Sequence, residues 1–202
     1  MKEKGVTLVE IVISIFLIVL FSAILISDFP RILKQFALTR AVYKLAVDLR
    51  RIEDLGFSGV LLQDKEGNSL NPKGYGVYFD LANNESQYIL YIDRGDSYNA
   101  KYDNISQFCQ ENEDPYKDCI LEIIDVKNEN PNVFIKQIRD KEGDEIYRPL
   151  SVNFTPPIPF VNIVDHEENT YSEVEIVLGL KFYPNVEKSV IVNKGGLIYI
   201  KY

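Results

Sequence analysis

The sequence has few of the side chains that enzymes use for chemistry. Its 202 residues include one histidine, one methionine, two cysteines and no tryptophan. It contains no Gly-x-Ser-x-Gly segment and no phosphate-binding glycine loop. The histidine, His166, lies in a run of polar residues, which is typical of a solvated turn. These absences predict a protein that is not an enzyme and needs no cofactor.

Positive charge is also scarce. Lysine and arginine together number 22 against 30 acidic residues, so the net charge is -8. Affinity for nucleic acid depends mainly on cationic contacts with phosphates. The acidity therefore argues against nucleic acid as a partner.

Only one long apolar run is present, at the N-terminus. From Val6 to Ile26 the single charged residue is Glu10. About 20 apolar residues at 1.5 Å each cross the roughly 30 Å hydrocarbon core of a bilayer. A cleaved secretory signal has a shorter apolar part, of about 7 to 15 residues, and a small-x-small cleavage site, which is not convincing here. Residues 6–27 are therefore expected to span the membrane once. The net positive flank, residues 2–4, places the N-terminus in the cytoplasm and the rest of the chain outside.

Glu10 needs an explanation, because a charged carboxylate in a membrane span costs roughly 2.5 to 3.5 kcal/mol on insertion scales. In one interpretation it is a chance residue near the helix end, whose carboxylate reaches back to the headgroups. In the other, a cation neutralises it.

The residues around Glu10 resemble a known signal. Lys4-Gly5, the segment Val6-Thr7-Leu8-Val9-Glu10 and the unbroken apolar helix after it resemble the class III signal of type IV pilins and type II secretion pseudopilins, over about 20 residues. In that family prepilin peptidase cuts after the glycine, here Gly5, and N-methylates the new terminus. That terminus is Val6, where the family usually has an aromatic residue. The cut would create an amine at Val6, largely cationic at neutral pH, to partner the Glu10 carboxylate of a neighbouring subunit.

The resemblance implies a structural role. The chain would be a subunit of a type IV pilus or a type II secretion pseudopilus, with the assembly motif at Thr7, Leu8 and Glu10. Its partners would be other pilin subunits, prepilin peptidase, the inner-membrane assembly platform and, before assembly, membrane lipid. It would start as a single-pass protein of the cytoplasmic membrane and end in a filament of the cell envelope or exterior. Removal of residues 1–5, whose net charge is +1, leaves -9, and so acidic a chain favours a minor subunit over a major one that packs beside many copies of itself.

The helix is expected to continue through residues 28–56. Apolar residues there recur at spacings of four and three and form one stripe: Leu38, Val42, Leu45, Leu49 and Ile52. The stripe covers about two heptads, which favours burial against the chain's own downstream domain over a coiled coil with another chain. Pro30 predicts a kink or a local break. Gly56 is expected to end the helix.

Residues 57–202 change to short runs rich in Val, Ile, Tyr and Phe, separated by turn residues, which indicates an antiparallel β head domain. With the leader 1–5, the span 6–27 and the helix 28–56, this gives an α+β fold with a long N-terminal helix packed on a β head. Turns are expected at 64–68, 140–144 and 193–196. Strands are expected at residues 60–62, 75–79, 88–92, 133–138, 145–147, 151–154, 160–164, 173–182, 189–192 and 197–200.

Two sites are expected in the head. Cys109 and Cys119 are predicted to form a disulfide in an exported domain, worth roughly 2 to 3 kcal/mol for a loop of about ten residues. A zinc site is the alternative, but zinc needs four ligands and the single histidine is distant. Asp93, Asp96 and Asp103 are candidate calcium ligands, as in loops of some pseudopilins. They do not follow the spacing of an EF-hand.

Two other functions stay open. The same anchor could display a binding module, either a tip adhesin or a substrate-binding domain. Joint exposure of Tyr98, Tyr102 and Tyr116 would support that hypothesis. The chain could also be a plain membrane-anchored β domain, in which case Gly5 is never cut.

Overall fold

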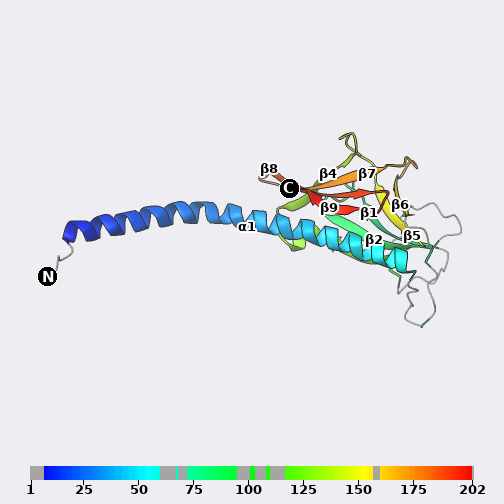
Figure 1. The fold of residues 1–202 in the computed structure, drawn as a ribbon, viewed down its shortest axis with the longest axis horizontal. Helices are drawn as coiled ribbons and strands as arrows, with labels where there is room; N and C mark the ends of the chain where they lie inside the picture. Colours follow the sequence, from blue (N-terminus) through cyan, green and yellow to red (C-terminus); the bar gives the residue numbers. More distant parts are fainter. Residues whose placement is uncertain are drawn as a thin grey trace. The chain divides into compact units, whose positions relative to one another are not determined.

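The structure is a computed structural model of the chain and describes residues 7–59, 67, 72–94, 101–102, 108–109, 117–156 and 160–201. The chain divides into two compact units, Met1–Phe36 and Ala37–Tyr202. The second is called the head unit below. Helix α1, Leu8–Ser58, contributes its first part to the N-terminal unit and its last part to the head unit (Figure 1).

Helix α1 remains helical across Pro30, so the prediction of a local break is wrong there. A proline removes one backbone hydrogen bond, and the helical turns on both sides keep theirs. A kink stays a prediction. The expected end at Gly56 is also wrong, because the helix continues to Ser58 and Gly59 follows with a φ of 61°. A left-handed glycine just past the last helical residue is a common way for a helix to end.

The strands that the structure describes in the head unit form two antiparallel sheets. The five-stranded sheet has the order β3-β2-β1-β5-β6, and the four-stranded sheet has the order β4-β7-β8-β9. A short 3-10 helix, η1 (Val126–Asn128), lies between β3 and β4. The first sheet consists of β1 (Gly74–Phe79), β2 (Gln87–Asp93), β3 (Cys119–Asp125), β5 (Leu150–Thr155) and β6 (Phe160–Asp165). The second consists of β4 (Val133–Asp140), β7 (Glu173–Leu180), β8 (Tyr183–Asn193) and β9 (Ile198–Lys201).

This arrangement confirms the α+β class and most of the expected strands. The expected strand 145–147 is wrong, because the segment contributes only an isolated bridge between Arg139 and Glu145. Strand β3 was not expected. The positive φ angles of Gly143 (94°) and Gly196 (80°) confirm two of the expected turns. The expected strand 60–62, and the expected turn at 64–68 except Gly67, lie outside the described residues.

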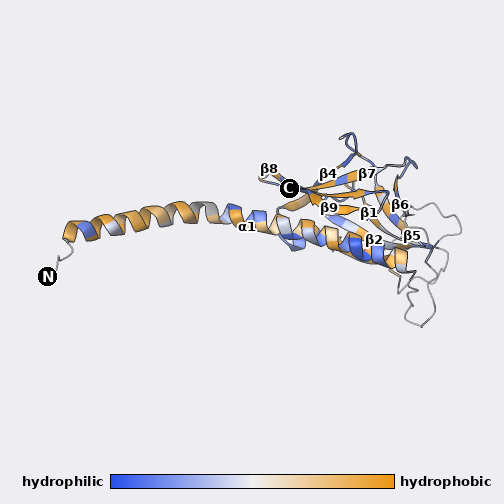
Figure 2. Ribbon diagram, viewed as in Figure 1, coloured by the Kyte–Doolittle hydropathy of each residue, from blue (hydrophilic) through white to orange (hydrophobic). Residues whose placement is uncertain are grey.

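The apolar stripe of α1 is buried inside the head unit. Its five members have no exposed surface and belong to one cluster with residues from both sheets: Leu38, Val42, Leu45, Leu49 and Ile52. Full burial of such a side chain contributes about 1.5 to 3 kcal/mol. The stripe thus packs inside the chain's own downstream domain, as expected. Figure 2 shows polar and apolar residues alternating along this part of α1.

Candidate functional site

The first turn of α1 contains the motif residues that the structure describes. The Glu10 backbone N–H donates to Thr7 Oγ1 at 3.3 Å and to the Thr7 carbonyl at 3.1 Å. Thr7 is therefore the N-cap of the helix, and Thr-x-x-Glu is the sequence of a capping box. Thr7 thus has a local role that the sequence pattern alone could have revealed. Gly5 and Val6 lie outside the described residues.

Beyond this turn, the N-terminal unit presents an apolar helix without cover. Residues 7–26 are all exposed, and Leu8 retains 79% of its surface. Figure 2 shows the hydrophobic colour along almost the whole of this part of α1. Within the described residues, α1 is the one helix long and apolar enough to cross a membrane. Glu10 is exposed on this surface. So large an exposed apolar surface marks a site of contact with lipid or with other proteins.

The predicted disulfide is present in the head unit. Cys109 and Cys119 are joined by an S–S bond of 2.10 Å, and both are buried. The Cys109 backbone N–H also donates to the Ile120 carbonyl at 2.9 Å. The bond therefore fastens residues 108–109 to the start of β3.

Tyr102 is buried, which contradicts the idea of an exposed tyrosine cluster at this residue. Its ring lies 4.8 Å from that of Tyr78 and 5.1 Å from that of Tyr91, on the strands β1 and β2. Its backbone N–H donates to Ser151 Oγ at 3.1 Å. Burial raises the pKa of Tyr102 to about 12. Contact with these two tilted rings on the sheet accounts for its position. Tyr98 and Tyr116 lie outside the described residues.

The calcium candidates are not brought together in the described part of the chain. Asp93 is 1% exposed, and its Oδ2 accepts a hydrogen bond from Asn153 Nδ2 at 3.3 Å. Asp96 and Asp103 lie outside the described residues. Among the residues described, no group of three or more His, Cys, Asp or Glu side chains is placed to hold a metal ion. Calcium binding stays a prediction.

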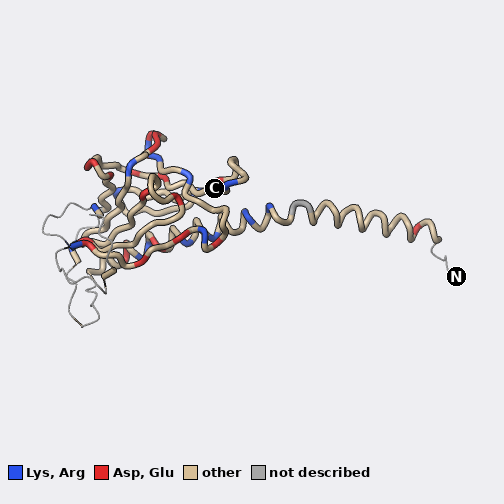
Figure 3. Tube along the Cα trace, turned by 180° about the vertical axis from the view of Figure 1, so that it is seen from behind, with Lys and Arg blue, Asp and Glu red and all other residues tan. Residues whose placement is uncertain are grey.

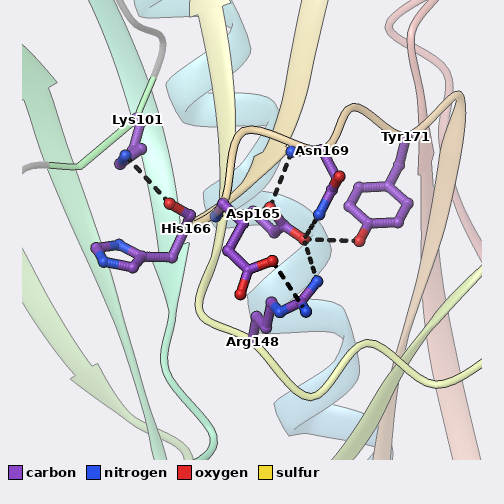
Figure 4. Close-up of polar contacts among 7 residues, drawn as sticks. Lys101, Arg148, Asp165, His166, Asn169 and Tyr171 are labelled. Atoms are coloured by element: carbon purple, nitrogen blue, oxygen red, sulfur yellow. Dashed lines mark hydrogen bonds and ion pairs between the residues drawn. The ribbon is translucent and has the colours of Figure 1, made fainter.

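A buried carboxylate at the end of β6 organises the loop that follows it (Figure 4). Asp165 Oδ1 accepts from the backbone N–H groups of Glu167 and Asn169, both at 2.9 Å. Its Oδ2 accepts from Asn169 Nδ2 and from the Tyr171 hydroxyl, both at 2.9 Å, and Arg148 lies 3.6 Å away. Burial disfavours the charged form, but the hydrogen bonds from Asn169, Tyr171 and Glu167 outweigh it and lower the pKa of Asp165. Both oxygens are occupied by donors, so this carboxylate holds the loop in place.

The single histidine stands beside this network without joining it. The His166 side chain is exposed, and Figure 4 shows its imidazole directed away from Asp165. Its carbonyl oxygen accepts a hydrogen bond from Lys101 Nζ at 3.2 Å. His166 therefore lies in a solvated turn, as its polar sequence context predicts.

A second buried carboxylate joins α1 to the five-stranded sheet. Asp48 is 8% exposed, and its Oδ2 accepts a hydrogen bond of 2.6 Å from the Tyr88 hydroxyl on β2. Burial raises the pKa of Asp48 and, together with the nearby Asp48 carboxylate, raises the pKa of Tyr88. The sequence signal for this contact was an acidic residue beside the apolar stripe, one residue before Leu49.

The described residues thus offer two surfaces for function: an uncovered apolar helix with a capped, acidic first turn, and a β head fixed by a disulfide and buried polar contacts. Searches against protein-family models, curated proteins and solved structures found no match to this chain.

Proposed function

We propose that this chain is a pilin-like structural subunit, of the minor kind, of a type IV pilus or a type II secretion pseudopilus. One observation carries the proposal: Thr7 and Glu10 form the first turn of a helix whose apolar side chains are exposed throughout residues 8–26. Lipid covers that surface before assembly, and the helices of other subunits cover it afterwards. The motif Lys4 to Glu10 adds the resemblance to the prepilin signal.

In the proposed mechanism, prepilin peptidase cuts after Gly5 and methylates Val6. The new amine of one subunit pairs with the Glu10 carboxylate of its neighbour. A buried ion pair is better suited to fixing register than to adding stability, because the desolvation of both charges offsets much of their attraction. The pair would therefore set how far the subunit moves into the filament, while the head stays on the outer surface or at the tip.

Replacement of Glu10 with alanine tests this proposal. We expect the Glu10→Ala chain to enter the membrane at least as well as the wild type, because the apolar helix loses its one charge. Its incorporation into filaments should fall at least about tenfold, since the amine of its neighbour loses the carboxylate that fixes its position. The measurement is the ratio of filament-bound to membrane-bound protein in cells that carry the assembly machinery.

Two control variants accompany this one. Ser14→Ala removes a polar side chain one turn further along the same helix, whose Oγ bonds to the Glu10 carbonyl at 2.8 Å, and it should assemble normally. Glu10→Asp keeps the negative charge and should be incorporated into filaments at a level between those of the wild type and Glu10→Ala. A normal filament yield from Glu10→Ala would show that the carboxylate does not guide assembly.

A further inference from the structure

A row of side chains crosses the outward face of the four-stranded sheet. In the strand register, Glu175 on β7 pairs with Arg139 on β4 and with Ile191 on β8. Ile191 pairs in turn with Tyr199 on β9. Side chains of residues paired in this way lie on the same face of a sheet, about 4.5 to 5.5 Å apart at their Cβ atoms. Val192, which follows Ile191, belongs to the hydrophobic core, and successive residues of a strand point to opposite faces, so the row faces away from the core.

This row lies in a hollow of about 400 Å³, a size within the roughly 300 to 1,000 Å³ of ligand pockets. Its floor is apolar. Ile191 is only 5% exposed although it lies outside the hydrophobic core, and Tyr199 beside it is 38% exposed. A tyrosine ring presents a flat apolar face next to a polar hydroxyl. The floor can therefore hold the apolar face of a small polar ring.

Charged side chains of both signs border this floor. Besides Asp140, the charged residues that line the hollow are Arg139, Lys141, Glu142, Glu173, Glu175 and Lys201. Asp140 Oδ1 accepts a hydrogen bond from the Asp144 backbone N–H at 2.8 Å and so holds the turn that contains Lys141 and Glu142. Figure 3 shows positive and negative residues interspersed in the same way along the head unit. A hollow with three cations and four carboxylates selects neither anions nor cations by charge alone.

Glu175 is a fixed acceptor in the middle of the row. Its Oε1 accepts a hydrogen bond from Ser189 Oγ at 2.6 Å and lies 3.2 Å from Lys201 Nζ, and its side chain is 16% exposed. Burial disfavours the charged form, but the contacts with Ser189 and Lys201 outweigh it and lower the pKa of Glu175. Within the described part of the chain, Oε2 accepts no hydrogen bond. An ionised carboxylate oxygen is thus left for a donor on a ligand.

We infer that this hollow binds one ring of a neutral saccharide. A sugar hydroxyl both donates and accepts hydrogen bonds, so a carboxylate and a cation placed side by side satisfy it. The C–H face of the same ring is apolar and fits against Tyr199. An anionic ligand would meet Glu173 and Glu175, and a cationic ligand would meet Arg139 and Lys201. This binding activity is separate from the proposed role in assembly and does not depend on it.

Saturation-transfer NMR tests the inference on the full chain in phosphatidylcholine vesicles, with empty vesicles as the background. The probes, at millimolar concentration, are four neutral oligosaccharides that differ in the orientation of single hydroxyl groups or in an acetamido group: cellotetraose, chitotetraose, mannotetraose and galactotetraose. We expect at least one to bind, with the strongest transfer to the C–H protons of its apolar face, because that face lies on the tyrosine ring. Salt at about 0.5 M should leave the binding unchanged, since the ligand carries no charge that salt could screen.

Variants assign the binding to the hollow. Tyr199→Ala should weaken it about tenfold, and Tyr199→Phe should keep most of it because the ring remains. Glu173→Ala, which removes one acceptor from the border, should also weaken it. Tyr147→Ala is the matched control: it removes a tyrosine that is 76% exposed on the head unit but does not line the hollow, and it should bind as the wild type does. Urea unfolding of each variant shows that it is folded.

Three outcomes would overturn the inference. They are equal binding by the wild type and Tyr199→Ala, no transfer to any of the four neutral probes, and binding confined to an anionic heparin tetrasaccharide. The assay uses the uncut chain and needs no assembly machinery. Saccharide binding by a chain that is never cut after Gly5 would therefore refute the proposed function alone, and normal filaments without saccharide binding would refute this inference alone.

Discussion

Replacing Gly56 with alanine should destabilise the head unit by about 1 to 3 kcal/mol, the usual cost of an overpacked core. A Cβ atom at this position would lie 2.6 Å from the Phe154 Cβ and 2.7 Å from the Phe154 carbonyl oxygen. Phe154 has no exposed surface and lies on β5, between β1 and β6, so its backbone has no room to withdraw. Helix propensity alone predicts the opposite sign, a gain of about 1 kcal/mol for alanine over glycine.

Gly179 provides the matched control. It is also buried, but an added Cβ would meet its nearest atom, Lys136 Cδ, at 3.5 Å, which is an ordinary contact. Gly179→Ala should therefore change stability little. The measurement is the free energy of unfolding in urea with the disulfide intact. A Gly56→Ala protein as stable as the wild type would mean that α1 does not approach β5 as closely as described.

Removal of the Asp165 carboxylate should cost at least about 3 kcal/mol, because it leaves several buried donors without an acceptor. Asp165→Ala leaves four donors without an acceptor: the backbone N–H groups of Glu167 and Asn169, the side-chain amide of Asn169 and the hydroxyl of Tyr171. Glu167→Ala is the control: that side chain is exposed and pairs with Arg148 at 2.9 Å on the surface, so its loss should cost under about 1 kcal/mol. Equal effects of the two substitutions, in urea unfolding, would contradict the role of Asp165.

The same carboxylate should make stability depend on pH. The pKa of Asp165 is lowered from its ordinary value of 3.8 in the folded protein, so its contribution is complete above that value and is lost as the pH falls through the lower, folded pKa. Glu175, whose pKa is also lowered against burial by Ser189 and Lys201, acts in the same direction. Asp48 acts oppositely: its pKa is raised by burial, so its contribution is present below 3.8 and is lost as the pH rises through the folded pKa. In the Asp165→Asn variant the free energy of unfolding should therefore fall less steeply as the pH drops below about 4.

The elements that the sequence predicted are those with a local signal. The stripe from Leu38 to Ile52 has the helical period, and Gly143 and Gly196 stand where turns need positive φ. Strand β3 escaped prediction because its register shifts at Leu90 and Tyr91 of β2, so its exposed and buried residues do not alternate regularly. Local patterns therefore predicted the class and most strands.

Contacts between residues far apart in the chain could not be predicted from the sequence. Gly56 appeared to be a helix stop, but its small size matters because Phe154 packs against it. The cover over Tyr102 depends on rings from two different strands. By contrast, the cap at Thr7 was readable from the Thr-x-x-Glu spacing.

The most direct test of the pilin-like account is the intact mass and N-terminal sequence of the protein recovered from cells with and without active prepilin peptidase. The account predicts a chain that begins at Val6, with an N-methyl group, when the peptidase is active, and a chain that retains residues 1–5 when it is absent. A chain that still begins at Met1 in the presence of active peptidase would contradict the account, and would leave a β head on a simple membrane anchor.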